Sequence, residues 1–145
     1  MGAKYLAPQS FDPAQDRFIA GLTYMFTISV ETHFRASHQL ARAGGSKERP
    51  HRHQWSVTAH VSSETLDNRG VIMDFQQLKA MVDDVVAELD NTALGKIEYF
   101  RGNTPSAENV AKYIYEKLEP RLPNGLRLCS IKVVEEPGCS ARFST

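Results

Sequence analysis

The stretch Glu48–Trp55, which reads ERPHRHQW, decides the fold of this chain because it leads from a charged loop into a predicted strand. His51 and His53 are two residues apart and are followed by an alternating run that ends near Val61. In an extended strand, residues i and i+2 point to the same face, so both imidazoles can reach one point in space. Two histidines on a rigid strand can supply two ligands of a metal site, although an isolated His-x-His is more often a solvated pair.

A third histidine, His38, ends another alternating run. The residues of one parity in that run are apolar: Phe26, Ile28, Val30, Phe34 and Ala36. An unbroken strand would therefore place His38 on the apolar face, where a histidine is more often a hydrogen-bonded core residue than a ligand. A Gly-rich loop separates this run from His51 and His53, so antiparallel pairing could bring the three imidazoles together. Three converging histidines favour a divalent metal, zinc first, because a catalytic zinc keeps three protein ligands and one open position.

Length and composition limit the classes of protein to consider. The chain has 145 residues, which suits one domain, and we read residues 1–22 as an N-terminal extension and 23–145 as a single domain. Its 17 basic and 17 acidic residues balance, which gives no argument for a nucleic-acid or membrane partner. No apolar run approaches the roughly 20 residues of a membrane span. The two cysteines, Cys129 and Cys139, suggest no disulfide framework, so we expect a cytoplasmic protein.

The periodicity predicts an α+β fold. The expected elements are strands at about 24–37, with a bulge near Glu31, and at 51–63, helices at about 74–90 and 104–118, and strands at 126–135 and 140–143. The order strand, strand, helix, helix, strand, strand is typical of a four-stranded antiparallel sheet with both helices on one face.

Capping signals predict where the two helices begin. Asp74 is the expected N-cap of the first helix, with Gln77 completing a capping box and Phe75 starting the buried stripe. Thr104 is the expected N-cap of the second helix, with Pro105 at its first helical position.

Six short motifs then occur in a fixed order: Phe34-x-Ala36-x-His38, His51-x-His53, Gly70-x-x-x-Asp74-Phe75-x-x-Leu78-Lys79, Leu89-Asp90, Pro105-Ser106-x-Glu108-Asn109 and Val134-Glu135. With these motifs, residues 25 to 143 resemble the 6-pyruvoyl-tetrahydropterin synthase / 6-carboxy-tetrahydropterin synthase family. The resemblance implies the tunnelling fold, in which ββααββ subunits associate as a trimer or hexamer and their sheets close into a β-barrel. It also implies active sites at subunit interfaces.

The resemblance assigns a zinc ion to the three histidines His38, His51 and His53. It also assigns pterin binding to Glu135, whose carboxylate would accept from the 2-amino group and N3–H of the ring. Glu135 could instead be a solvated charge at the end of a strand.

Three further residues receive roles through the resemblance. Ser106 and Glu108 fall where the family holds the pterin ring, although any acid in a first helical turn, such as Glu108, is favoured by the helix dipole. Asp90 falls at the catalytic aspartate of the family's Asp–His proton relay.

The chain departs from the family pattern at three positions. No cysteine stands before the His-x-His to act as the base, Arg52 replaces the glycine between the two histidines, and Asn91 replaces the relay histidine. Asn has no titratable proton near neutral pH, so it cannot act as a general acid or base. Glu48 stands three residues before His51, as in a variant branch of the family in which a carboxylate replaces the thiolate. It could equally be a solvated loop charge.

The resemblance implies a zinc-dependent lyase that acts on the side chain of 7,8-dihydroneopterin or its triphosphate. The variant branch that Glu48 resembles is associated with cleavage to 6-hydroxymethyl-7,8-dihydropterin, a folate precursor, so we favour that reaction, with Glu48 as the catalytic base. The alternatives are a 6-carboxy-tetrahydropterin synthase of the queuosine (deazapurine) route, a non-catalytic pterin-binding paralogue, and a structural oligomer without zinc.

Overall fold

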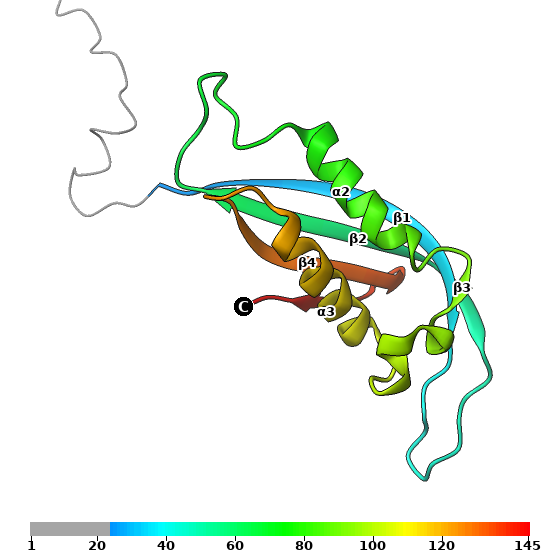
Figure 1. The fold of residues 1–145 in the computed structure, drawn as a ribbon. Helices are drawn as coiled ribbons and strands as arrows, with labels where there is room; N and C mark the ends of the chain where they lie inside the picture. Colours follow the sequence, from blue (N-terminus) through cyan, green and yellow to red (C-terminus); the bar gives the residue numbers. More distant parts are fainter. Residues whose placement is uncertain (1–23) are drawn as a thin grey trace, which may run out of the picture.

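A computed structural model describes residues 24–145 as one twisted sheet with two helices on one face (Figure 1). The strands lie in the order β3-β1-β2-β4-β5. The predicted extension, residues 1–22, lies outside the described residues. The elements are β1 (Phe26–His38), β2 (His51–Ser63), α2 (Phe75–Ala87), β3 (Thr92–Ala93), α3 (Ala107–Leu118), β4 (Arg127–Glu136) and β5 (Cys139–Phe143), with 3-10 helices at Leu94–Lys96, Glu98–Arg101 and Glu119–Arg121.

The predicted α+β class and the two helices on one sheet are confirmed, with two corrections to the sheet. It has a fifth strand, β3, which pairs parallel to β1 over two residues and makes the sheet mixed. The bulge predicted near Glu31 is wrong, because β1 and β2 pair without a shift from Phe26 opposite Ser63 to His38 opposite His51. Glu31 is one of the outward residues of an unbroken alternation, and the irregularity of β2 lies at His60, facing β4.

The core lies between the helices and one face of the sheet. Trp55 is fully buried in this core, with its ring stacked on Phe34 at a centroid distance of 5.7 Å. The outward residues of the long strands form the other face, which we call the open face; it is largely polar, as the alternating burial of β1 and β2 shows. The two faces therefore offer separate environments for functional side chains.

Helix α2 begins where its cap predicts, but the side chain of its first residue is exposed. Asp74 accepts a hydrogen bond from the backbone N–H of Gln76 at 2.7 Å, and the described residues show no capping-box bond from Gln77. Phe75 is 56% exposed, so its predicted burial is wrong. It lies with Phe26 and Leu66 around a surface pocket at one end of the sheet, beyond the helix–sheet core.

Helix α3 begins two residues later than predicted. Its N-cap is Ser106, whose hydroxyl accepts from the backbone N–H of Asn109 at 3.2 Å. The carbonyl of Thr104 instead accepts from the Asn109 side chain at 2.8 Å. Two residues that favour the N-cap position flank Pro105, and the second of them, Ser106, makes the cap.

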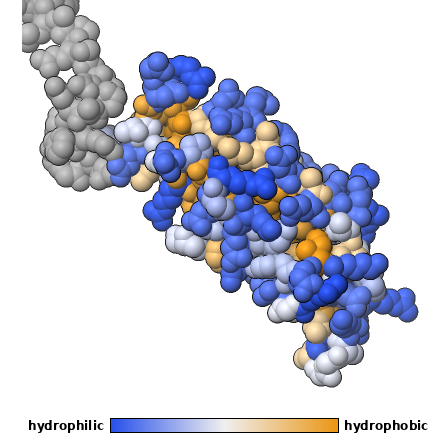
Figure 2. Space-filling view, in the orientation of Figure 1, coloured by the Kyte–Doolittle hydropathy of each residue, from blue (hydrophilic) through white to orange (hydrophobic). Residues whose placement is uncertain are grey.

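Among residues 24–145, the exposed large apolar side chains are Tyr24, Met25, Phe26, Leu66 and Phe75. Figure 2 shows hydrophilic side chains over most of one face, with apolar colour near the start of β1. Among residues 24–145, no helix is long and apolar enough to cross a membrane.

Candidate metal centre and active site

The β1–β2 ladder brings the three predicted histidines together. His38 and His51 are direct cross-strand partners, and His53 lies opposite Ala36. The ring centroids are 4.6 Å apart for His38 and His51 and 4.7 Å apart for His51 and His53. All three side chains share the parity of the buried residues, so they lie at the end of the helix-covered face.

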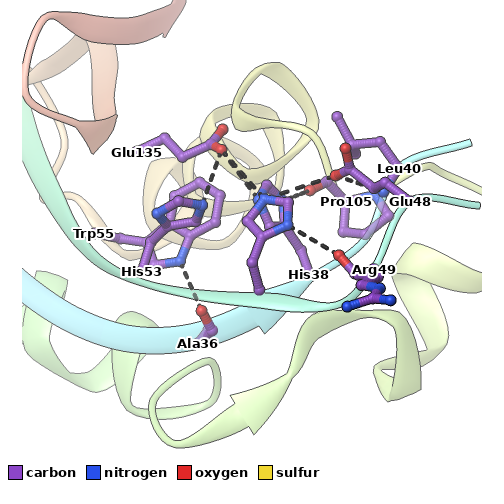
Figure 3. Close-up of polar contacts among 10 residues, drawn as sticks. Ala36, His38, Leu40, Glu48, Arg49, His53, Trp55, Pro105 and Glu135 are labelled. Atoms are coloured by element: carbon purple, nitrogen blue, oxygen red, sulfur yellow. Dashed lines mark hydrogen bonds and ion pairs between the residues drawn. The ribbon is translucent and has the colours of Figure 1, made fainter. Parts of the chain in front are cut away.

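Glu135, near the end of β4, is the fourth member of the cluster (Figure 3). Its Oε1 lies 3.1 Å from His38 Nε2, 3.3 Å from His53 Nε2 and 4.0 Å from His51 Nε2. One ligand atom from each of the four residues lies within 4.8 Å of the others. Ligands around a tetrahedral zinc are about 3.3 Å apart, so this spacing fits a single divalent ion.

Two of the imidazole nitrogens of the cluster are buried without a hydrogen-bond partner among residues 24–145. They are His38 Nε2 and His53 Nε2, which have only the Glu135 carboxylate nearby. A buried polar atom without a partner costs about 1–3 kcal/mol. A bound cation would satisfy both nitrogens, so the donor set fits a metal on chemical grounds as well as on spacing.

Backbone carbonyls fix the orientation of two of the rings. The Nδ1–H of His38 donates to the carbonyl of Pro105 at 2.7 Å, and that of His51 donates to the carbonyl of Arg49 at 3.1 Å. A carbonyl can only accept, so these bonds leave Nε2 of each ring with a free lone pair. The buried ring of His38 also packs edge-on against Trp55 at 4.8 Å. The imidazoles are therefore oriented for metal binding by the fold itself.

Glu48 lies beside the cluster in the loop before β2. Its backbone N–H donates to the carbonyl of Leu40 at 2.9 Å, and its Oε1 accepts from the Leu40 N–H at 3.1 Å. The same Oε1 is 3.6 Å from His51 Nε2, and the side chain is 29% exposed. Glu48 is therefore a fixed, half-buried carboxylate at the rim of the cluster rather than a solvated loop charge.

Asp90 lies away from the histidines, at the edge of β1. Its Oδ1 accepts from the backbone N–H of Arg35 at 2.9 Å, and its Oδ2 accepts from the Asn91 side chain at 3.2 Å. Arg35 is three residues before His38, or about 10 Å along the strand, and it belongs to the open face. One chain alone does not bring Asp90 to the metal centre.

The two pterin-binding residues predicted on α3 lie at different distances from the cluster. Ser106 is half-buried and directly follows Pro105, whose carbonyl contacts His38. Glu108 is exposed in the first turn of α3 and has no contact with the cluster among residues 24–145.

The remaining two histidines lie outside the cluster. His33 is exposed on β1 and pairs with Glu31 at 3.2 Å. His60 belongs to the open face, where burial, followed by the charges of Arg142 and Lys132, lowers its pKa. Neither could complete the metal centre.

The fold and the cluster define a class of protein: an α+β subunit with three histidines and one glutamate as a candidate metal centre at the end of its sheet. The chain belongs to the 6-pyruvoyl tetrahydropterin synthase family, whose model matches residues 27–145. It is therefore a pterin-converting lyase of that family.

Two relatives and two solved structures illustrate the family. The chain is 34% identical over 102 residues to a dihydroneopterin monophosphate aldolase of Pyrococcus furiosus, covering 70% of this chain and 86% of the relative. It is 34% identical over 128 residues to a 6-carboxy-5,6,7,8-tetrahydropterin synthase of Synechocystis, covering 82% of this chain and 93% of the relative.

The solved structures share the fold. The Caenorhabditis elegans 6-pyruvoyl tetrahydropterin synthase superposes with a TM-score of 0.74 at 22% identity, covering 85% of this chain and 97% of that one. A glutamate-to-alanine catalytic-residue mutant of the Plasmodium vivax 6-pyruvoyltetrahydropterin synthase superposes with a TM-score of 0.63 at 19% identity. The superposition covers 83% of this chain and 97% of that one.

Proposed function

We propose that this protein is a zinc-dependent lyase that cleaves the side chain of 7,8-dihydroneopterin, or of a phosphorylated form of it, to 6-hydroxymethyl-7,8-dihydropterin. The observation that carries the proposal is the position of Glu48, whose carboxylate lies 3.6 Å from His51 in a chain without a cysteine before Cys129. A carboxylate therefore stands where a base can act on a hydroxyl group held at the metal centre. Pyrococcus and Plasmodium relatives support the proposal, since one is an aldolase and the other has a catalytic glutamate.

The chain's own residues would perform the cleavage in a retro-aldol sequence. His38, His51 and His53 would hold the zinc ion, which would supply Lewis-acid chemistry that makes a side-chain hydroxyl easier to deprotonate. Glu48 takes the proton of the C2′ hydroxyl, and the C1′–C2′ bond breaks to release glycolaldehyde. The electron pair moves into the C6=N5 imine of the dihydropterin, and a proton is then added at C1′ to give the hydroxymethyl group.

Substrate binding would use residues from more than one copy of the chain. Glu135 would accept two hydrogen bonds from the pterin ring, with Ser106 and Glu108 beside it. Asp90 points away from its own metal centre, so a catalytic role for it requires a homo-oligomer, a trimer or hexamer, that places it at a neighbour's site. The outer strands β3 and β5 leave two open edges through which such a sheet can be extended.

A 6-carboxy-tetrahydropterin synthase is the second candidate. The Synechocystis relative carries that activity and matches a longer stretch of this chain than the aldolase does. The two reactions share the pterin, the metal centre and the loss of C2′ and C3′, since each product keeps one side-chain carbon. They differ in the base and in the oxidation state in which C1′ is left, a hydroxymethyl group in one product and a carboxylate in the other.

Product analysis tests the proposed reaction. We expect the zinc-loaded protein to convert dihydroneopterin, or a phosphate ester of it, to 6-hydroxymethyl-7,8-dihydropterin and glycolaldehyde or its phosphate, identified by chromatography and mass spectrometry. Formation of 6-carboxy-tetrahydropterin from the triphosphate would establish the second candidate instead. Zinc and pterin binding without any turnover would identify a non-catalytic binder.

Replacing Glu135 with glutamine separates pterin binding from metal binding. Three histidines suffice for a catalytic zinc, so we expect the Glu135→Gln protein to keep about one zinc per chain. It should bind dihydropterin roughly 10- to 100-fold more weakly, because a neutral amide cannot replace a bidentate carboxylate. Metal analysis and fluorescence titration with the pterin measure the two effects.

Glu136→Gln is the matched control, since Glu136 is the neighbouring exposed glutamate of β4. It should behave as wild type in both measurements. Loss of zinc from Glu135→Gln would show that Glu135 is a metal ligand and not only a pterin anchor.

A further inference from the structure

Two of the positions at which this chain departs from the family pattern are in direct contact. Arg52 stands in the place of a glycine and Asn91 in the place of a histidine, and Arg52 Nη2 donates to Asn91 Oδ1 at 3.0 Å. The two residues are 39 positions apart in the sequence. The hydrogen bond fixes the two side chains relative to each other.

The backbone and Asp90 hold Asn91 in place. Asn91 has a positive φ of 56°, which asparagine tolerates, and its N–H donates to the carbonyl of Arg35 at 2.6 Å. Its Nδ2 donates to Asp90 at 3.2 Å, so its Oδ1 is left to accept from Arg52. Asn91 thus orients the guanidinium of Arg52 on the open face.

A second arginine lies next to this pair. In the β1–β2 register, Arg35 is opposite Gln54 and Arg52 is opposite Ser37, so the two arginines are diagonal neighbours on the open face. A small pocket of about 300 Å³ lies beside them, lined by His33, Phe34, Arg35, Gln54, Asp90 and Asn91. Hydrogen-bonding groups therefore surround a space large enough for one small oxyanion.

The charges around this pocket leave both guanidinium groups without an acidic partner. Within residues 24–145, neither Arg35 nor Arg52 forms an ion pair, and the carboxylate of Glu31 is paired with His33. Asp90, the acid in the pocket, already accepts from the Arg35 backbone and from Asn91. No carboxylate among these residues therefore holds either guanidinium group, and the remaining N–H donors of Arg35 in the pocket and of Arg52 beside it can bind an anion.

We propose that Arg35 and Arg52 form a subsite for the phosphate group of a phosphorylated dihydropterin side chain. Guanidinium groups match phosphate with paired N–H donors and stay charged at every relevant pH. The proposal rests on the proposed function, because Asp90 in the same pocket is the residue expected to serve a substrate bound at another copy's metal centre. In the family pattern, a histidine of a proton relay stands at the position of Asn91. In this chain Arg52 and Asn91 form a fixed anion-binding pair there, which selects substrates with a phosphorylated side chain over those with an unphosphorylated one.

Titration with inorganic phosphate tests the subsite without turnover. We expect the zinc-loaded protein to bind phosphate, measured by calorimetry, and Arg52→Gln and Arg35→Gln each to weaken binding roughly 10- to 100-fold. Arg52→Gln keeps a donor for Asn91, and Arg52→Lys, which keeps the charge, should bind with intermediate strength. Zinc analysis of each variant shows whether the neighbouring His51 and His53 are intact.

Lys132→Gln is the control, since Lys132 is a cation on the same open face outside the pocket. It should leave phosphate affinity unchanged. Phosphate bound only at the metal centre would be insensitive to all these variants, and that result, or no binding at all, would overturn the subsite.

Substrate selectivity tests the source of the phosphate. We expect the ratio of kcat/KM for dihydroneopterin monophosphate to that for dihydroneopterin to fall roughly 10- to 100-fold in Arg52→Gln, because only the phosphorylated substrate loses a charged contact. An unchanged ratio would overturn the assignment to the substrate. If neither pterin is converted, the proposed function fails, while the phosphate titration still decides the subsite.

Discussion

Replacement of His51 by alanine is expected to abolish both bound zinc and turnover while leaving the fold intact. In the proposed zinc site His51 is one of three imidazole ligands, and removing one ligand from a three-histidine site removes most of its affinity. Its side chain is 39% exposed, so truncation opens little cavity in the core. The completely buried His38 would be a poorer choice, because its removal would also cost packing against Trp55.

Elemental analysis, circular dichroism and size-exclusion chromatography measure the outcome. His33→Ala is the matched control, since His33 is an exposed histidine of β1 outside the cluster and should keep about one zinc per chain. Acid should release the zinc from wild type, because protonated imidazoles cannot bind a metal. Full zinc occupancy in His51→Ala would refute the site.

Replacement of Glu48 by glutamine is expected to lower turnover by roughly 10²–10⁴-fold, or about 3 to 5 kcal/mol of barrier. Glutamine keeps the oxygen that accepts from the Leu40 N–H, so the loop should retain its shape. The glutamine amide cannot take a proton, so no base would act on the C2′ hydroxyl of the substrate. Zinc content and pterin affinity should be close to wild type, and single-turnover kinetics would place the loss in the chemical step.

Glu31→Gln, which alters an exposed glutamate of β1, should turn over like wild type. If Glu48→Gln also did so, Glu48 would have only a structural role in its loop. If instead the wild-type product were 6-carboxy-tetrahydropterin, the second candidate would stand.

Most of the fold could be predicted because its signals are local. Alternating side chains marked both long strands, and the parity that puts Phe34 in the core also puts His38 there. The meeting of the three histidines followed from antiparallel pairing alone. Strand β3 could not be predicted, because two residues carry no periodicity.

The details of the site depend on contacts that are distant in the sequence. Nothing in the pair Glu135 and Glu136 shows which carboxylate reaches the histidines, since that depends on the register of β4 against β2. Phe75 fits the helical stripe but lies beyond the end of the covered sheet. The contact between Arg52 and Asn91 joins a strand to a distant turn, so it appears only in three dimensions.

The pairing of His38 with His51 has a consequence for how the chain folds. A slip of one residue between β1 and β2 would turn one set of side chains to the opposite face, and the imidazoles would no longer meet. A metal ion that binds only the aligned histidines stabilises the correctly registered hairpin over every slipped alternative, by an amount that grows with metal concentration. A sufficient metal concentration would therefore favour the correct strand register. The metal centre and the β1–β2 hairpin that carries it would then form together.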